Sequence, residues 1–556
     1  MTTNAAFSVA RAAGKVPTDR PFGKDMANNA FLSAFLATTV HDDVFFYAAT
    51  GGAAEKYREI VPTLTDRTFR THFLSQNDIS RLAEPGCLMH LDPHLGRDAW
   101  DRRRVGQRSF SIVALIHTMA GPFNLDAHME TLLGPVQSWD ALVCTSRAVK
   151  RTVEMLFERW SDYLSDRFGA TRLPAPQLPI LPLGVDVARF RRTDQRRAAG
   201  HAWRQRLGIA PDALAVLYLG RLSYVEKAHP TPMLIALEQA ARQTGRKFHM
   251  IFAGWFPTPD HDGAFRAAHA LYAPSIGMSI VDGRTEPAKT EIWHAADVFC
   301  SMVDNIQETF GLAPVEAMAA GLPCVVSDWD GYRDTVRHGE DGFRIATVMP
   351  PAGTGGLLPL GNASLNESFQ RYVGSAALMT SVDIPQAATA FATLATNVEL
   401  RRTMAENAAT RAREVFDWPI VMRHYRELWT ELADRRRTDA ENAPRRENQS
   451  HEPRVEDPFR LYGHFATRQV VPEMVVALPP AGTGVAAADI PKSSLNNLAD
   501  RHFLTPAEQR EVLARLARGP QTVRAVLETV PRVRRLAAYR WLGHLLKFDA
   551  LRIVDA

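Results

Sequence analysis

Short apolar runs alternate with amphipathic stretches along most of this chain, and the alternation begins twice. Between Phe31 and Phe190 the runs are 44–49, 87–91, 111–117, 141–146 and 178–184, with helical spacing of apolar residues in 26–40 and 147–164. After Gly200 the runs are 214–220, 248–255, 278–283, 297–302 and 323–327, and the stretch 231–245 has helical spacing. Strands separated by helices are typical of a parallel sheet covered on both faces. The sequence therefore predicts two doubly wound α/β domains in tandem, although a first strand before residue 44 is hard to see.

The rest of the chain divides by composition. We expect an N-terminal domain over 1–190 and a second domain over 191–434, interrupted by a Gly- and Pro-rich insert at 346–380. Residues 435–457 are polar and Pro-punctuated, as in a linker. The extension 458–556 ends in a helical, basic region, with eleven Lys and Arg against five Asp and Glu in 501–556. Its pattern resembles a winged helix, but we favour a small helical domain with solvated basic faces.

Composition excludes several classes of protein. No stretch reaches the ~20 apolar residues that span a bilayer, and the N-terminus lacks a hydrophobic signal region. The four cysteines are scattered without a CxxC spacing, so neither a disulfide framework nor a zinc site is expected, and a reduced cytosolic setting fits. A net charge of +4 suits anionic small molecules or an acidic membrane face and does not by itself indicate nucleic acid.

The stretch 304–345 is the one around which we expect a binding site. Glu308 lies in a polar loop, the tripeptide Phe310-Gly311-Leu312 follows, and a helix carrying Glu316 ends near Gly321. A helix N-terminus at the end of a parallel sheet binds anions, because its free N–H groups point outward. We therefore predict a phosphate-bearing ligand, with the two carboxylates placed to bind hydroxyls.

Two cations and a histidine follow other predicted strands. Arg221 comes directly after the run 214–220, and Lys227 lies six residues later. Alone they would be read as surface cations, but beside a helix N-terminus in the same sheet they favour a diphosphate site. His117 closes the run 111–117, where a structural role and a cleft-facing role are equally well supported.

Other readings of these residues are weaker. Glu308 and Glu316 also suggest the acid and base of a glycoside hydrolase, but a loop and a helix need not face one bond. Asp328-Trp329-Asp330 has the spacing of a metal-binding DxD, yet it lies between an apolar run and Gly331, where a turn is favoured. No glycine-rich dinucleotide motif or phosphate loop occurs where it would be needed. We expect no metal and no cofactor.

Taken together, these motifs resemble family 4 glycosyltransferases, which are retaining enzymes of the GT-B fold. In this fold two Rossmann-like domains face a cleft. The segment 308–343 is similar to the E-x7-E signature of the family, 220–230 to its Arg…Lys diphosphate motif, and 181–190 to its interdomain segment. The segment 416–429 resembles the start of the closing helix, expected over 418–434, which crosses back to the first domain. The similarity covers roughly residues 20–432.

The resemblance implies a role for each of these residues. Glu316 would hold the ribose hydroxyls of a nucleotide, and Glu308 the hydroxyls of the donor sugar. The diphosphate would be bound by Arg221, Lys227 and the backbone of Phe310, Gly311 and Leu312, while His117 would touch the sugar from the N-terminal domain and Gly23 would lie in a loop near the acceptor. The chain departs from the family in an Arg–Lys spacing one residue longer than usual and in the insert 346–380.

The expected activity is transfer of a sugar from a nucleotide-diphosphate sugar to a hydroxyl acceptor, in synthesis of a polysaccharide, glycolipid or other glycoconjugate. One alternative is a catalytically silent scaffold whose basic C-terminal domain binds nucleic acid, although every expected site residue is present. Another is a nucleotide-sugar epimerase of similar fold. The basic amphipathic segment 532–547 is also a candidate for docking on anionic lipid, which would suit a lipid-linked acceptor.

Overall fold

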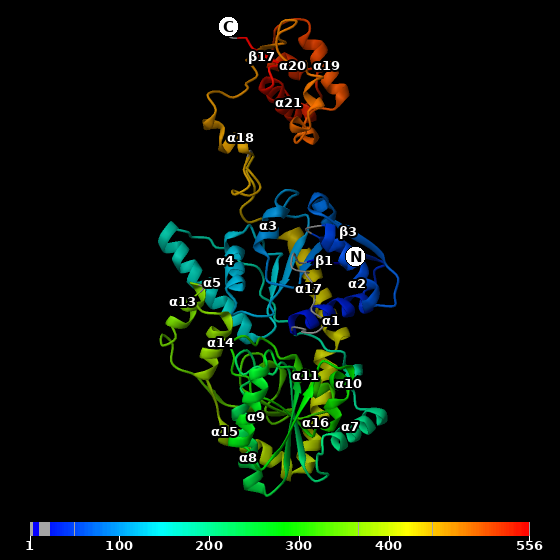
Figure 1. Cartoon of the computed structure of the whole chain (residues 1–556), viewed down its shortest axis with the longest axis vertical. Helices are drawn as coiled ribbons and strands as arrows, with labels where there is room; N and C mark the ends of the chain where they lie inside the picture. Colours follow the sequence, from blue (N-terminus) through cyan, green and yellow to red (C-terminus); the bar gives the residue numbers. More distant parts are fainter. Residues whose placement is uncertain (1–3, 10–22, 49–50, 365, 448, 555–556) are drawn as a thin grey trace. The chain divides into compact units, whose positions relative to one another are not determined.

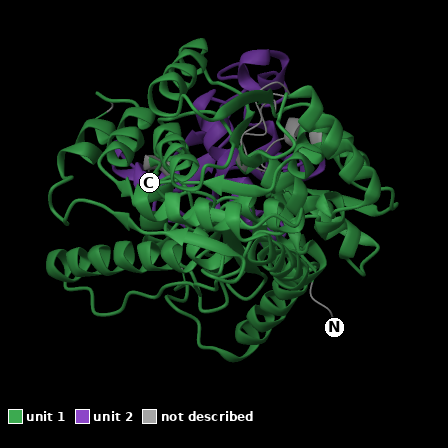
Figure 2. Ribbon diagram, turned by 90° about the horizontal axis from the view of Figure 1, so that it is seen from below, with its two compact units in different colours: residues 1–451 green, residues 452–556 purple. Residues whose placement is uncertain are grey.

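The computed structural model describes residues 4–9, 23–48, 51–364, 366–447 and 449–554 (Figure 1). The chain divides into two compact units, residues 1–451 and residues 452–556, which Figure 2 shows in different colours. Across the described residues, no helix combines the length and the apolar character needed to cross a bilayer. The two units are described in turn.

The first sheet of the larger unit is parallel throughout and has the strand order β3-β2-β1-β4-β5-β6. The strand that the sequence hides is β1, which lies at the centre and pairs with both β2 and β4. It is only four residues long, too short to give a periodic pattern. The strands are β1 (Ala6–Val9), β2 (Asp43–Ala48), β3 (Arg70–Leu74), β4 (Cys87–His90), β5 (Ser111–Leu115) and β6 (Ala141–Val143).

The second sheet repeats the same order, β12-β11-β10-β7-β8-β9, again with parallel neighbours. In each sheet the direction in which successive strands are added reverses between two central strands. These are β1 and β4 in the first sheet and β7 and β10 in the second. Doubly wound sheets bind ligands at this point, beyond the carboxyl ends of the strands. The strands are β7 (Leu214–Leu219), β8 (Phe248–Gly254), β9 (Gly277–Asp282), β10 (Val298–Ser301), β11 (Cys324–Ser327) and β12 (Gly342–Ile345).

Helices pack on both faces of the two sheets, which confirms the predicted fold class of two Rossmann-like α/β domains. In the first domain they are α1 (Gly23–Thr38), α2 (Gly51–Leu64), α3 (Gly96–Arg102), α4 (Pro122–Leu133) and α5 (Arg147–Phe168). In the second they are α6 (Val187–Phe190), α7 (Asp194–Arg206), α8 (Pro230–Thr244), α9 (Pro259–Tyr272), α10 (Glu286–Thr290), α11 (Leu312–Ala319), α12 (Tyr332–Thr335), α15 (Ile384–Thr396) and α16 (Val398–Arg411).

The strand predicted at 178–184 is wrong. This segment runs beside β6 and exchanges a few backbone hydrogen bonds with it, from Leu142 N to Gln177 O at 2.9 Å and from Leu181 N to Cys144 O at 3.0 Å. It forms isolated bridges only. The cause is the prolines at 179 and 182, which remove the N–H donors that a continuous ladder needs.

Helix α17 (Trp418–Thr438) crosses from the second domain to the first, where it packs against α1 (Figure 1). The rings of Phe31 and Tyr425 meet edge to face with centroids 4.7 Å apart, and those of Phe35 and Trp429 at 6.0 Å. The helix is four residues longer than the predicted end at 434, so the polar segment 435–438 continues the helix and the predicted linker start is wrong. Its first turn carries Trp418, which packs directly on Gly184.

The insert 346–380 has its own structure. It is closed at its base by a two-stranded antiparallel sheet of β13 (Thr347–Val348) and β14 (Ser381–Val382). Between these strands lie α13 (Leu357–Ala363) and α14 (Phe369–Leu378), which contact each other. The insert is therefore an ordered helical excursion from the second domain.

The smaller unit is mainly helical, as expected, but it also contains a three-stranded antiparallel sheet that the sequence did not reveal. Its helices α18 (Pro458–Leu461), α19 (Pro506–Leu516), α20 (Val523–Leu527) and α21 (Arg535–Lys547) are accompanied by β15 (Val475–Ala477), β16 (Gln521–Thr522) and β17 (Arg552–Ile553). Helices α19, α20 and α21 with a small antiparallel sheet fit both the small helical domain that we favoured and the resemblance to a winged helix. Strands of two or three residues are too short to be recognised from their periodicity.

Candidate active site

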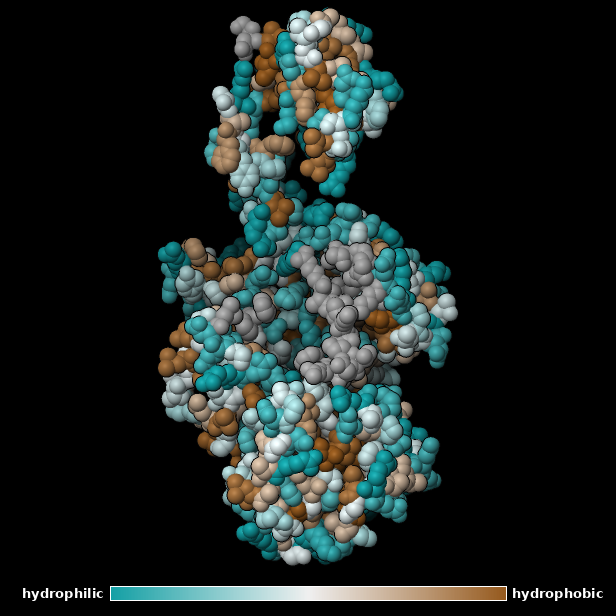
Figure 3. Space-filling view, in the orientation of Figure 1, coloured by the Kyte–Doolittle hydropathy of each residue, from teal (hydrophilic) through white to brown (hydrophobic). Residues whose placement is uncertain are grey.

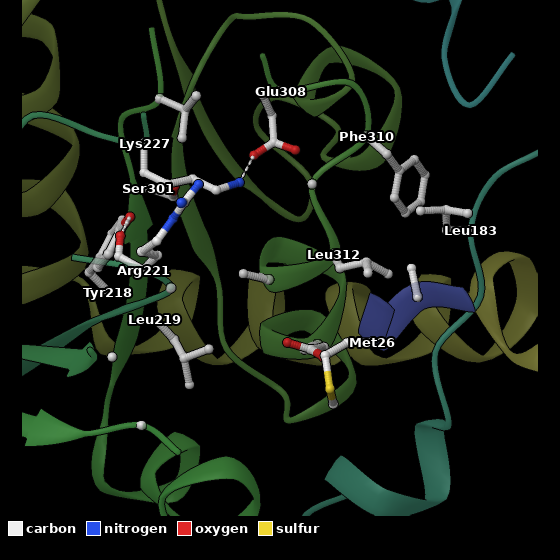
Figure 4. Close-up of a pocket in the computed structure, with 18 of the residues that line it drawn as sticks. Met26, Leu183, Tyr218, Leu219, Arg221, Lys227, Ser301, Glu308, Phe310 and Leu312 are labelled. Carbon is white, nitrogen blue, oxygen red and sulfur yellow. Dashed lines mark hydrogen bonds and ion pairs between the residues drawn. The ribbon is translucent and has the colours of Figure 1, made fainter. Parts of the chain in front are cut away.

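A cleft of about 420 Å³ is lined by residues of both domains of the larger unit. All the residues singled out in the sequence except one line this cleft: His117, Arg221, Lys227, Glu308, Phe310, Gly311, Leu312 and Glu316. Figure 4 shows the arrangement, with Phe310 and Leu183 facing each other on one side of the cleft and the two cations on the other. Residues far apart in the sequence are thus brought to one place.

The parallel sheets account for this gathering. His117 follows β5, Arg221 follows β7 and Glu308 follows β10. Since the carboxyl ends of parallel strands lie at the same edge of a sheet, side chains that follow β7 and β10 emerge together. His117 emerges at the corresponding edge of the first sheet and reaches the cleft from the opposite domain.

The cations beside β7 are paired with carboxylates. Lys227 Nζ lies 3.1 Å from Glu308 Oε2 (Figure 4), and Arg221 Nη1 lies 2.9 Å from Glu226 Oε2. Burial alone would raise the pKa of Glu308, but the charge and hydrogen bond of Lys227 outweigh it and hold that pKa below its ordinary value. Glu308 is therefore an acceptor of hydrogen bonds at neutral pH rather than a proton donor.

The N-terminus of α11 begins at Gly311, where the backbone takes a left-handed conformation with φ of 89°. A Cβ atom at this position would lie 2.1 Å from the ring of Tyr332, which is itself buried and hydrogen-bonded to Ser301 at 2.9 Å. Only glycine fits here, since any side chain would meet both the backbone strain and the ring. Gly311, Leu312 and Ala313 line the cleft, and no side chain among the described residues caps the N-terminus of α11, as a helix N-terminus that binds anions requires.

Thr309, which lies between Glu308 and Phe310, contacts the first domain. The hydroxyl of Thr309 donates to the carbonyl oxygen of His117 at 2.9 Å. Nearby, the hydroxyl of Ser146, at the N-cap of α5, donates to Asp330 at 3.3 Å. Sequence reasoning missed Thr309 and Ser146, because hydroxyls that bridge two domains leave no pattern in either one.

Burial sets the protonation of three groups around the cleft. It raises the pKa of Glu316 to about 7, and burial together with the charge of Glu308 raises that of Asp330 to about 8. Burial, assisted by the charge of Lys24, lowers the pKa of His117 to about 3. His117 is therefore neutral at physiological pH, while Glu316 is poised to change its charge near neutrality.

Gly23 is placed differently from the expectation. It is the first residue of α1 and does not lie in a loop, and the preceding residues 10–22 lie outside the described part of the chain. The same turn contributes Lys24, Met26 and Ala27 to the lining of the cleft. The loop expected at Gly23 is therefore wrong, and the proximity of this region to the acceptor stays a prediction.

The segment Asp328-Trp329-Asp330 is a turn, as favoured from the sequence. Asp330 has a positive φ of 41°, and Tyr332 N donates to Trp329 O at 3.0 Å. The indole of Trp329 donates to the carbonyl oxygen of Asn305, which ties the turn to the loop that carries Glu308. Among the residues that the structure describes, no cluster of three His, Cys, Asp or Glu side chains has the arrangement of a metal site.

Several lining residues were not predicted. They include Arg189, Trp255, Arg284 and Lys289 from the second domain and Thr118 from the first. Trp255 and Arg284 lie just beyond β8 and β9, so the rule that found Arg221 would have found them if it had been applied to every strand. Arg189 and Lys289 lie on α6 and α10, and only the tertiary structure brings them to the cleft.

Comparison with known proteins supports the resemblance. Residues 201–350 match the family model described as glycosyl transferases group 1. The chain is 33% identical over 196 residues to the D-inositol 3-phosphate glycosyltransferase of Geodermatophilus obscurus, a match covering 33% of this chain and 39% of the relative. It is 28% identical over 276 residues to that of Acidothermus cellulolyticus, covering 48% of this chain and 57% of the relative.

Among solved structures, Anabaena Alr3699/HepE in complex with UDP has the same fold, with a TM-score of 0.51 and 15% identity. The match covers 77% of this chain and all of the Anabaena chain. The two-domain GT-B architecture is thus confirmed, and within it residues 201–350 are similar to glycosyl transferases group 1. The chain spans about two fifths of the length of the first curated relatives that it matches, 38% for that of Nocardia farcinica and 39% for that of Geodermatophilus obscurus.

The first prediction concerns the start of α11. We expect Gly311→Ala to destabilise the protein by more than the ~1–2 kcal/mol that a left-handed alanine costs, because its methyl group would also meet Tyr332. Gly321→Ala is the matched control, since Gly321 is left-handed as well, with φ of 73°, but has open space around its Cβ position. The free energy of unfolding from urea titration measures both, and equal losses would contradict the packing argument.

Proposed function

We propose that this protein is a retaining glycosyltransferase of the family 4 type, which moves a sugar from a nucleotide-diphosphate sugar to a hydroxyl acceptor. The observation that carries the proposal is the meeting of Arg221, Lys227 and the N-terminus of α11 on one side of a cleft that His117 closes from the other domain. Two cations and free N–H groups bind a diphosphate, and they also stabilise the negative charge that grows on it as the glycosidic bond breaks.

The carboxylates fit hydroxyl recognition in this proposal. Lys227 keeps Glu308 ionised, so that Glu308 accepts hydrogen bonds from the donor sugar, and Glu316 does the same for the ribose. The acceptor attacks from the face that the diphosphate leaves, and a phosphate oxygen takes its proton. This scheme requires neither a protein nucleophile nor a metal ion. His117, being neutral, offers the sugar a hydrogen bond without a charge.

We expect Arg221→Ala and Glu308→Ala each to lower kcat/KM by about a hundredfold or more, because each removes a charged contact to the reacting groups. Arg242→Ala is the control, since Arg242 is an exposed cation of the same domain that pairs with Glu238. Turnover is measured with a screen of nucleotide sugars and hydroxyl acceptors, and circular dichroism checks the fold. A chelator should leave the rate unchanged.

Full activity in either variant would overturn the site assignment, and a strict need for Mn²⁺ or Mg²⁺ would restore the metal reading of Asp328 and Asp330. Product formed without an acceptor would identify an epimerase. A wild-type chain that binds no nucleotide sugar, while its retention on duplex DNA falls as salt is added, would favour the silent scaffold.

The pKa of Glu316 leads to a prediction on pH. A ribose hydroxyl donates to the ionised carboxylate, so the affinity for a nucleotide sugar should fall as the pH drops below about 7, by up to about tenfold per pH unit. The ligand is esterified at both ends of its diphosphate and does not titrate in this range itself. Calorimetric titration from pH 5.5 to 8.5 measures the effect, and Glu316→Gln should flatten the profile. An unchanged slope in that variant would assign the titration to another group, such as Asp330.

We also propose that the C-terminal unit docks on anionic membrane, which would bring a lipid-linked acceptor to the enzyme. Val533, just before α21, and Leu536, in its first turn, are 89% and 71% exposed. The exposed Arg532 precedes them, and the exposed Arg540 and Lys547 lie further along α21. Figure 3 shows hydrophobic and hydrophilic residues side by side on this unit. Exposed aliphatic side chains flanked by arginines suit the interface of a lipid membrane. They suit nucleic acid less well, because the edges of its bases are recognised by hydrogen-bond donors and acceptors.

The full chain should therefore sediment with phosphatidylserine-containing vesicles at low salt and remain free of neutral phosphatidylcholine vesicles. Leu536→Asp should reduce the bound fraction severalfold, because it places a charge in the apolar part of the interface. Leu498→Asp is the matched control, since Leu498 is 95% exposed in the same unit but lies outside α21. Indifference to anionic vesicles would rule the proposal out, and binding to duplex DNA instead would assign this surface to nucleic acid.

A further inference from the structure

Two features that set this chain apart from the family it resembles lie in contact. One is the loop between Arg221 and Lys227, which is a residue longer than usual, and the other is the insert 346–380. Gly374 of α14 in the insert packs against Val225 in the loop, so closely that a Cβ on Gly374 would lie 2.6 Å from Val225 Cγ1 and 3.3 Å from its carbonyl oxygen. Gly374 is buried in this contact.

A polar chain of contacts continues from the insert to the cleft. The side-chain amide of Gln370, one turn earlier in α14, donates to Glu226 Oε1 at 3.4 Å. The other oxygen of Glu226 lies 2.9 Å from Arg221 Nη1, and the side chains of Arg221 and Glu226 are only 13% and 12% exposed. The carboxylate of Glu226 thus links the insert to the guanidinium in the cleft.

The loop is fixed from the opposite side as well. The side-chain amide of Asn305 donates to the carbonyl oxygen of Val225 at 2.8 Å. Asn305 lies three residues before Glu308, and Glu308 N donates to Asn305 O at 3.3 Å. Val225 is therefore held between the stretch that carries Glu308 and the helix α14. Both faces of the loop are constrained.

We propose that α14 is a positioning element of the donor site, in which Gly374 and Gln370 act through Val225 and Glu226 to place Arg221 against the diphosphate. The inference rests on the proposed function. A cation that must contact a ligand directly loses much of its value when it is displaced by ~1 Å, so a loop that carries both Arg221 and Lys227 needs a rigid support. The insert provides this support. The β13–β14 pair, in which Val348 lies opposite Ser381, joins the insert to the second domain.

The test is the preference for a nucleoside diphosphate over the monophosphate, because Arg221 is placed to act on the diphosphate and not on the nucleoside. The wild-type protein is titrated with UDP, GDP and ADP by calorimetry at about pH 8. The nucleoside diphosphate that binds is then compared with the monophosphate of the same nucleoside. In Gly374→Leu the side chain would push Val225 away, and we expect the diphosphate preference to fall by about tenfold with monophosphate affinity unchanged. The control Arg371→Leu places the same side chain on the exposed face of α14.

A second variant covers the case in which Gly374→Leu fails to fold. Residues 349–380 are replaced by Asn-Gly, which closes the β13–β14 pair as a two-residue hairpin between Val348 and Ser381. This variant should lose the diphosphate preference as well. A folded variant of either kind that keeps the wild-type preference overturns the inference while leaving the proposed function intact. A wild-type chain that binds none of the three diphosphates overturns the proposed function and the inference with it.

Discussion

The cleft exists because two separate crossings of the chain between the domains are fastened to each other. The first crossing passes through Val185 and the second through Phe416 to Trp418. Val185 N donates to Phe416 O at 2.8 Å, and Trp418 N donates to Val185 O at 3.2 Å. Beyond this point α17 packs its aromatic rings on α1, among the most deeply buried residues of the unit. Two sheets with facing carboxyl edges are thereby held at a distance that leaves a cleft between them.

The charges at the cleft are balanced in a way that suits ligand exchange. Arg221 pairs with Glu226 and Lys227 with Glu308, so the four side chains carry no net charge in the unliganded protein. None of them is fully buried, and a diphosphate can therefore share the cations without leaving a carboxylate in an apolar environment. In the proposed function, Lys227 would turn to the diphosphate and Glu308 would regain acceptor capacity for a sugar hydroxyl. The ion pairs would hold the four side chains in place until that ligand binds.

Sequence reasoning succeeded where the location of a residue follows from a strand–helix pattern. Arg221, Glu308 and His117 were found because each follows a strong apolar run, and parallel strands bring such positions to one edge. The α11 N-terminus was found from its glycine and the break at its end. The reasoning failed at β1, which is too short to show a period, and at 178–184, where apolar residues suggested a strand that prolines prevent. It also missed Thr309, because no local pattern records a hydroxyl that meets a carbonyl of another domain.

The longer loop and the insert are best understood as a single change. An extra residue between Arg221 and Lys227 would allow the loop to bulge and would separate the two cations from the N-terminus of α11. In this chain Val225 lies in that loop, where its carbonyl oxygen accepts a hydrogen bond from Asn305 and its side chain packs against Gly374. The absence of a side chain at Gly374 allows the helix backbone to approach the loop closely. A longer loop and an added support thus offset each other, and Arg221 and Lys227 both line the cleft beside the N-terminus of α11.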